Sequence, residues 1–251
     1  IMPLATDMSG IQFRTLNTRK GPAVRALRAQ CDREIYKKSI QKILKQTSIE
    51  ILEGEVIDLM VEKGAVIGVE VENVGTVHAE KTILTTGTFL NGIMYSGKTK
   101  KYGGRVGEKP SIPLSERMYG MGLMMGRLKT GTPPRIKMSS LNLNVMDEQP
   151  GDLPTPFMSS LQKQHPHPKQ LSCFITRTTL KTKKIIEKDL HLSAMYSGQI
   201  QGIGPRYCPS IEDKVEKFKN KETHQVFIEP EGINIDLVYP NGISSSLPVE
   251  T

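Results

Sequence analysis

The segment between residues 49 and 80 constrains the fold of this chain most strongly. It consists of short runs rich in strand-forming residues, and turn residues separate these runs at Lys63-Gly64 and near Gly75. Short runs divided in this way predict a small antiparallel β-meander. No internal repeat or low-complexity tract interrupts the chain, so the meander is expected to belong to an ordinary globular fold.

The segments on either side of the meander predict a helix and a further strand. Residues 21–46 carry apolar side chains at helical spacing, and Pro22 suits a first helical turn. Cys31 falls on this apolar stripe, so we expect it to pack in the core. Residues 81–89 are predicted to form an apolar strand that ends in Thr86-Gly87-Thr88. A glycine at that end of a strand lets a ligand approach the backbone, and an ordinary tight turn is an equally good interpretation.

The second half of the chain continues the mixture of helices and strands. Residues 111–125 contain a predicted helix, and residues 138–170 are proline-rich and loop-like. His165 and His167 lie in that loop without nearby Cys or acidic residues, so we interpret them as exposed histidines and expect no metal site. The remaining predictions are a strand over 171–179 with Cys173 packed inside it, a helix over 179–190, and strands and turns over 224–248.

Two segments of the chain concentrate its positive charge. The net charge is +8, and residues 14–45 and 98–137 each hold ten Lys/Arg against two Asp/Glu. This distribution favours an anionic partner, although two solvated basic faces would produce the same pattern. Few aromatic residues lie in or beside these segments (Phe13, Tyr36, Tyr102 and Tyr119), so phosphate contacts are favoured over base stacking.

The cysteines and apolar runs indicate the kind of compartment. Three cysteines without CxxC spacing argue against a disulfide scaffold or a zinc knuckle and favour a reducing compartment. No apolar run is long enough to span a membrane, and residues 1–10 do not resemble a signal peptide.

Cys208 is the candidate reactive residue. Ser210 and Asp213 have the spacing of a capping box, so a helix is predicted to begin just after Cys208. The partial positive charge of that helix end, together with Arg206, would favour the thiolate. Gly202 and Gly204 could let the same turn seat a phosphate. A small buried residue that merely packs is the competing interpretation of Cys208.

Several strings of the sequence together resemble the MnmG/GidA family, flavoproteins that modify the wobble uridine of certain tRNAs. They occur in unbroken order along essentially the whole chain: SGIQFRTLN, GPAVRALRAQCDR, TTGTFLNG, GGRVGEKPSIPLS, GRLKTGTPPRI, GIGPRYCPSIEDKV, FIEPEG and YPNGISSSLP.

The resemblance implies a specific α/β architecture. Residues 1–135, with the β-meander near 49–80, would be part of a Rossmann-like FAD-binding domain. Residues 136–251 would be an inserted, incomplete α/β domain of the NAD-binding type. Members of the family begin with a GxGxxG turn that seats the FAD pyrophosphate, and no GxGxxG occurs in this sequence. We therefore expect an internal fragment that lacks the first βα unit and the helical C-terminal domain, and that is inactive alone.

The resemblance also implies an activity and its partners. The enzyme would install a carboxymethylaminomethyl or aminomethyl group at C5 of the wobble uridine. It would use FAD, NADH, and methylene-tetrahydrofolate as carbon donor, with glycine or ammonium. It would act as a homodimer with the GTPase partner MnmE, in the cytoplasm or, in a eukaryote, in the mitochondrion.

The resemblance also implies site residues, at the positions of this sequence that match the motifs of the family. Cys208 corresponds to a cysteine required for activity in the family. FAD contacts are expected at Val56, Thr86, Gly87, Thr88 and Ser111. Contacts to tRNA are expected from Arg105, Arg127, Lys129 and Arg135. The stretch matched to NAD comprises Gly204, Pro205, Arg206, Tyr207, Cys208, Pro209, Ser210, Ile211, Glu212, Asp213, Lys214, Val215, Glu216, Lys217 and Phe218.

Two other interpretations remain open from the sequence. One is a folate- and FAD-dependent tRNA uridine methyltransferase of the TrmFO type, against which the long 138–251 segment argues. The other is a non-catalytic module that binds tRNA or a protein partner.

Overall fold

The computed structural model describes residues 1–160, 167–200 and 209–251, and these residues form two compact units. Unit 1 comprises Ile1–Ile49, Gly131–Glu187 and Pro209–Ser245. The described residues of unit 2 are 50–130, 188–200 and 246–251. Helices and several small antiparallel sheets occur together, which confirms a mixed α/β fold.

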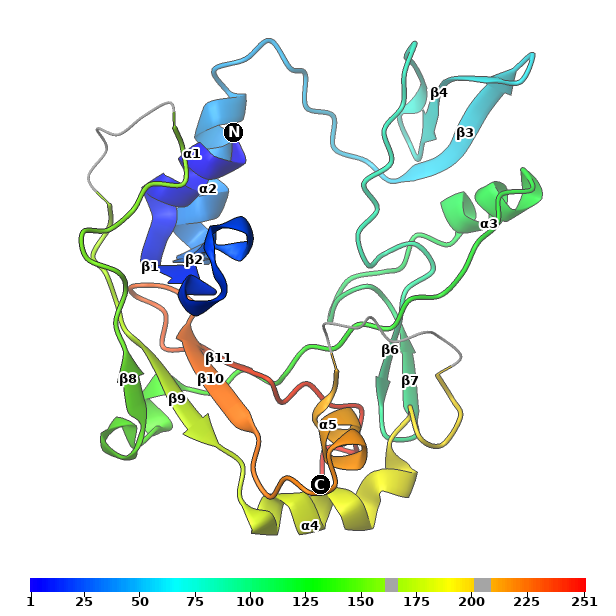
Figure 1. Ribbon diagram of the computed structural model, residues 1–251. Helices are drawn as coiled ribbons and strands as arrows, with labels where there is room; N and C mark the ends of the chain where they lie inside the picture. The colour runs from blue at the N-terminus through cyan, green and yellow to red at the C-terminus, as the bar shows by residue number, and fades with distance from the viewer. Residues whose placement is uncertain (161–166, 201–208) are drawn as a thin grey trace. The chain divides into compact units, whose positions relative to one another are not determined.

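The larger sheet of unit 1 has four strands in the order β11-β10-β9-β8, and every neighbouring pair is antiparallel (Figure 1). Its core consists of Val226, Ile228 and Val238, and Ile136 and Phe174 pack against them. The predicted strands around residues 171–179 and 224–248 are thereby confirmed. The bounds are Asp147–Gln149 for β8, Cys173–Arg177 for β9, Gln225–Pro230 for β10 and Val238–Asn241 for β11.

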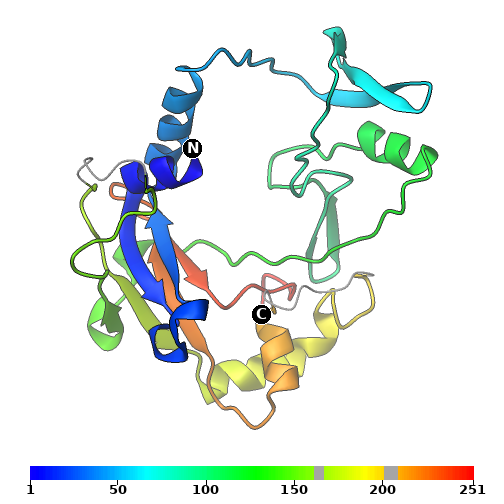
Figure 2. The same cartoon turned by 45° about the horizontal axis from the view of Figure 1, so that its top comes forward.

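A two-stranded ribbon with two helices completes this part of unit 1. Strand β1 (Gly10–Leu16) pairs with β2 (Ala26–Cys31), and helix α1 (Met2–Ser9) packs against α2 (Arg33–Leu44), as Figure 2 shows. The prediction of one helix over 21–46 is therefore wrong in its first half.

The side chain of Asp32 explains where the helix starts. Its Oδ1 accepts hydrogen bonds from the backbone N–H groups of Glu34 and Ile35, both at 3.0 Å, and this caps α2. Residues before the cap pair with β1 instead, so Cys31 lies at the end of a strand and not on a helical stripe.

Two further helices of unit 1 agree with the sequence prediction. Helix α4 spans Leu180–Asp189 and α5 spans Ile211–Lys217. Short 3-10 turns occupy Thr18–Lys20, Pro22–Val24, Met138–Ser140 and Leu143–Val145 in unit 1, and Leu190–Leu192 in unit 2. None of the helices in the described residues is long and apolar enough to cross a membrane.

Unit 2 contains the predicted meander, with β3 (Val56–Glu62), β4 (Ala65–Val71) and β5 (Gly75–His78) in antiparallel order. Lys63 and Gly64 have φ angles of 48° and 80°, so the turn adopts the left-handed conformation that glycine favours. A hairpin of β6 (Ile93–Ser96) and β7 (Thr99–Tyr102) follows, then helix α3 (Pro113–Gly120).

The predicted strand over residues 81–89 is absent from the described structure. This segment joins no ladder, and the only bridge nearby is a parallel one between Leu90 and Ser111. Ile83 is 86% exposed and Leu84 39%, so the described residues supply no apolar layer for the segment to pack on. Apolar composition alone was insufficient here, because a strand also needs a partner for its backbone hydrogen bonds.

Candidate functional site

Only part of the predicted reactive turn can be described. Gly204, Pro205, Arg206, Tyr207 and Cys208 lie outside the described residues. The helix that follows them is present, and its capping box is confirmed. Ser210 Oγ accepts from the backbone N–H of Asp213 at 3.3 Å, and Asp213 Oδ2 accepts from the backbone N–H of Ser210 at 3.1 Å. The helix therefore begins at Ile211, with the N-cap two residues after Cys208.

The turn of residues 242–244 holds this helix in place. The backbone N–H of Ile211 donates to the carbonyl of Ser244 at 2.8 Å, and Lys214 Nζ donates to the carbonyl of Gly242 at 2.7 Å. Ile211 and Val215 are buried. The inner face of the predicted nucleotide stretch thus packs against its own unit. Lys217 and Phe218, at the end of the helix, are exposed.

Unit 2 brings four of the five predicted flavin residues together. The backbone N–H of Phe89 donates to the carbonyl of Thr86 at 3.1 Å, which closes a turn around Gly87. Ser111 and Phe89 are joined by a hydrogen bond of 2.9 Å from the Ser111 N–H to the Phe89 carbonyl. Thr88 Oγ1 donates to the carbonyl of Gly104 at 2.9 Å. Residues 86–88, 104 and 111 therefore form one loop cluster, which we call the Thr86–Ser111 cluster.

Glycines allow the loop segments of this cluster to approach closely. A Cβ atom on Gly92 would lie 2.3 Å from the Thr88 carbonyl oxygen, and one on Gly104 would lie 2.7 Å from the same atom. Gly87 differs, because its φ is +57° and nothing lies within 4 Å of its Cβ position. The backbone at Gly87 is thus open to an approaching group, which fits a ligand at this turn.

Val56, the fifth predicted flavin residue, lies at the start of β3, opposite Val71. Helix α3, which begins just after Ser111, is docked on this strand. Arg117 Nε lies 2.7 Å from Asp58 Oδ1, and Arg117 donates to the carbonyl of Leu59 at 3.3 Å. Helix α3 thus links the strand that carries Val56 to the chain segment just after Ser111.

The four predicted tRNA contacts differ in how accessible they are. Arg105 is exposed and lies 3.4 Å from Glu108, while Arg127 donates to the carbonyl of Asn91 at 3.0 Å. Lys129 is only 8% exposed. Arg135 is held by Glu231. Of the four, Arg105, Arg127 and Arg135 are exposed and Lys129 is buried.

A buried carboxylate network was not found from the sequence. Glu231 is 8% exposed, and both Arg33 and Arg135 reach it, at 2.9 and 2.5 Å. Arg28 on β2 pairs with Glu229 on β10, two residues before Glu231. Burial raises the pKa of Glu229, and the cation of Arg28 opposes that rise. Two arginines of the first basic segment are thus committed to internal ion pairs.

The described thiols are not activated. Cys173 is fully buried, donates to Gln12 Oε1 at 3.3 Å, and burial raises its pKa to about 12. Burial also raises the pKa of Cys31. The predicted packing of Cys173 is confirmed, and neither thiol has the lowered pKa of a nucleophile.

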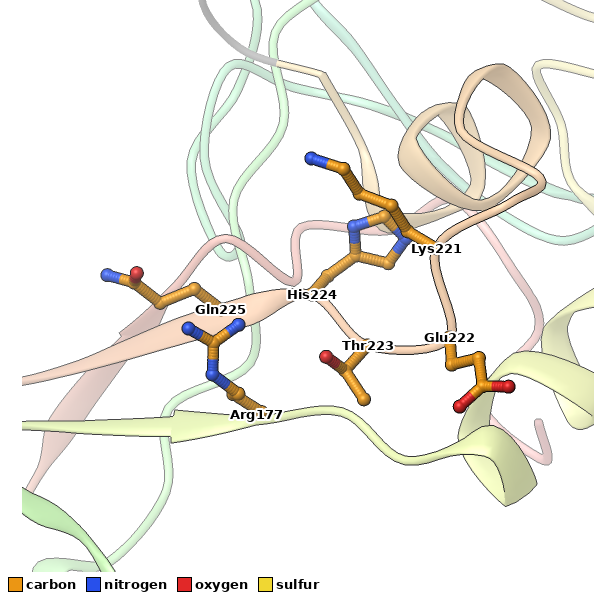
Figure 3. Close-up of a pocket in the computed structure, with 6 residues that line it drawn as sticks. All are labelled: Arg177, Lys221, Glu222, Thr223, His224 and Gln225. Atoms are coloured by element: carbon orange, nitrogen blue, oxygen red, sulfur yellow. The ribbon is translucent and has the colours of Figure 1, made fainter.

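A shallow hollow of about 430 Å³ lies where β9 ends and β10 begins (Figure 3). Arg177, Lys221 and Glu222 line its rim, and His224 is only 8% exposed. His224 Nε2 is buried and has no hydrogen-bond partner among the described residues. Burial, followed by the charges of Lys214 and two other lysines, lowers the pKa of His224. The described residues contain no group of three or more side chains suited to a metal ion.

Comparison with known proteins identifies the family. The family model described as "Glucose inhibited division protein A" matches residues 1–251. The chain belongs to the GidA family. The MnmG/GidA resemblance inferred from the sequence is thereby confirmed.

Two solved structures of GidA from Aquifex aeolicus support this membership. The GidA chain in the form I crystal is 44% identical in sequence to this chain, with a TM-score of 0.90. The match covers 99% of this chain and 43% of that GidA chain. The GidA chain in the form II crystal is 41% identical, with a TM-score of 0.88, and the match covers 99% of this chain and 41% of that GidA chain. This GidA family chain therefore spans less than half the length of these relatives.

Proposed function

We propose that this chain is part of a flavin-dependent enzyme that modifies tRNA at C5 of the wobble uridine. The observation that carries the proposal is the family match over residues 1–251, together with a TM-score of 0.90 to a GidA structure. The group installed would be carboxymethylaminomethyl or aminomethyl. NADH, methylene-tetrahydrofolate, and glycine or ammonium would be co-substrates, and the GTPase MnmE would be the partner of a cytoplasmic or mitochondrial homodimer.

The Thr86–Ser111 cluster is the proposed flavin side of the enzyme. FAD would supply the reducing electrons for the one-carbon unit. Gly87 supports this placement because its backbone is open on the side where a Cβ would stand. Thr86, Thr88 and Ser111 would orient the cofactor, and Val56 would contact it from β3. Residues 1–135 and 136–251 remain the proposed FAD-binding and NAD-binding-type domains.

A pair of glycine variants tests the flavin placement. Gly87→Ala in the full-length protein should lower the flavin content, because the new methyl group occupies the open approach and strains the backbone. Gly64→Ala is the matched control, since its φ is +80° and nothing lies within 4 Å of its Cβ position either. It carries the same strain in the meander turn. Equal flavin content in the two purified variants would contradict the placement.

Cys208 is the proposed nucleophile of the modification step, as a thiolate that attacks the uridine ring or the activated one-carbon unit. Its support is the position two residues before the N-cap of α5. Cys208→Ser in the full-length protein should retain flavin and abolish modification, as measured by mass spectrometry of tRNA nucleosides.

Cys31→Ser is the control for this test, because burial raises the pKa of the Cys31 thiol and the variant should modify tRNA normally. Wild-type levels of modified uridine in the Cys208 variant would refute the nucleophile. A product of 5-methyluridine in the wild type would instead favour the methyltransferase interpretation.

A further inference from the structure

The β6–β7 hairpin carries aromatic and basic side chains on one face. In the antiparallel register Tyr95 lies opposite Lys100, and Ile93 lies opposite Tyr102. Directly opposed residues project to the same side of a ribbon, and alternate residues of one strand share that side. Tyr95, Lys100 and Tyr102 therefore occupy one face, which we call the tyrosine face. Lys100 Nζ lies 5.1 Å from the centroid of the Tyr102 ring, a cation–π distance.

The charged groups of this hairpin are available to a partner. All residues of β7 are exposed, and so is Lys98 in the turn. Tyr102 itself is 55% exposed. Lys98, Lys100 and Lys101 have no ion-pair partner among the described residues. Arg105, three residues beyond the hairpin, extends the row of cations, although Glu108 lies 3.4 Å from it.

The opposite face of the hairpin is anchored to the last residues of unit 2. Ser96 projects to that side, and its Oγ donates to the carbonyl of Leu247 at 3.3 Å. The backbone N–H of Gly97 donates to the carbonyl of Ser246 at 2.8 Å. A Cβ on Gly97 would lie 2.8 Å from Pro248, so only glycine permits this approach. The hairpin is thus held from one side, and the tyrosine face points away from this anchor.

We propose that the tyrosine face binds an unpaired base of single-stranded RNA while Lys98, Lys100 and Arg105 contact the adjacent phosphates. This inference rests on the proposed function, in which the substrate is a tRNA whose target base lies in a loop. Aromatic rings flanked by cations suit single strands, because every unpaired base offers a face for stacking. Duplex RNA hides those faces, and the carboxylates of an acidic protein surface would engage the cations without using the tyrosine rings.

Aromatic substitutions test the stacking in the full-length protein. Tyr102→Leu and Tyr95→Leu should each weaken binding of a tRNA transcript and of oligouridine by about tenfold in fluorescence anisotropy. Tyr102→Phe retains the ring and should bind like the wild type. Tyr119→Leu is the matched control, since Tyr119 on α3 is 54% exposed. An unchanged affinity in both leucine variants, with normal flavin content, would overturn the proposal.

Substitutions of the basic residues test the phosphate contacts. Replacing Lys98, Lys100 and Arg105 with Gln should reduce the slope of log affinity against log salt by about 2 for oligouridine. The same charge change at Lys181, Lys184 and Lys188, which are exposed on α4, should leave the slope nearly unchanged. Equal slopes in the two triple variants would refute the contacts. A larger loss of affinity for duplex RNA than for oligouridine would refute them too. A wild-type protein that binds no tRNA would instead refute the proposed function itself.

Discussion

Arg135 Nε lies 2.5 Å from Glu231 Oε1. This ion pair joins the segment before the 3-10 turn Met138–Ser140 to the residue that follows β10. The Arg135 guanidinium also lies 4.5 Å from the centroid of the Tyr239 ring on β11. Arg33 reaches the other oxygen of Glu231 at 2.9 Å. A carboxylate shared by two arginines from distant segments fixes three parts of unit 1 to one another.

Glu231→Gln should destabilise the protein. The change leaves two guanidinium groups without their buried counter-ion, and both arginine side chains are partly exposed, so they can turn toward water. We therefore expect a loss of about 1–2 kcal/mol, below the 3–5 kcal/mol of fully buried pairs. Urea unfolding measures the change. Glu34→Gln is the control, because Glu34 also pairs with Arg33 but is exposed, and its loss should be near zero. Equal losses in the two variants would contradict the special role of Glu231.

Asp32→Ala should lower the free energy of unfolding by more than the loss of an ordinary helix cap does. Asp32 Oδ1 caps α2, and Oδ2 accepts from the backbone N–H of Ile233 at 2.8 Å, so one carboxylate serves two segments. Loss of an N-cap costs about 1 kcal/mol, and a further unsatisfied N–H adds about 1 kcal/mol or more. Gly232→Ala should also destabilise, because its Cβ would lie 2.6 Å from Asp32 Oδ2. A stability of either variant equal to the wild type in urea titration would contradict this arrangement.

Local signals in the sequence predicted part of this structure well. The meander followed from its turn residues, and the start of α5 followed from Ser210 and Asp213. The prediction of one helix over 21–46 is wrong in its first half, because the alternation of Leu27, Ala29 and Cys31 also suits a strand and Asp32 caps the helix that follows. Local sequence contained the decisive signal in each of these examples.

Contacts between residues that are far apart in the sequence could not be predicted from such local signals. Residues 81–89 have the composition of a strand, but composition does not show whether a partner is present to complete the ladder. Glu231 is far from Arg33 and Arg135 in the sequence, so no spacing indicated their contact. Tyr95 lies outside the basic segment 98–137, and only the β6–β7 register places it beside Lys100.

The three cysteines should react at very different rates if Cys208 is activated as proposed. Burial raises the pKa of Cys173 to about 12 and also raises that of Cys31, so both thiols remain protonated at pH 8. Iodoacetamide at pH 8 should therefore label Cys208 first and Cys173 last in the native protein. Peptide mass spectrometry after short reaction times gives the order. Labelling of Cys173 or Cys31 ahead of Cys208 would contradict the activated thiol, and unfolding in urea should abolish the differences.

His224 should make the stability depend on pH. Its pKa is lowered in the folded protein, so the unfolded chain takes up a proton first as the pH falls. The unfolded imidazole titrates near pH 6.5, roughly its ordinary value. Stability is therefore fully present above that pH and is lost as the pH falls from there to the folded pKa. The cations responsible after burial are Lys214 on α5, Lys221 before β10 and Lys183 on α4, and Glu222 in the same turn is the nearby acid.

His224→Gln should remove this component of the pH dependence. Thermal unfolding at pH 5.5 and pH 7.5 should show a smaller difference between the two melting temperatures in the variant than in the wild type. His78→Gln supplies the comparison, because His78 is exposed at the end of β5 and should leave the difference as it is. The prediction fails if the wild type and His224→Gln lose the same stability on acidification, since the buried imidazole would then not be the group that titrates.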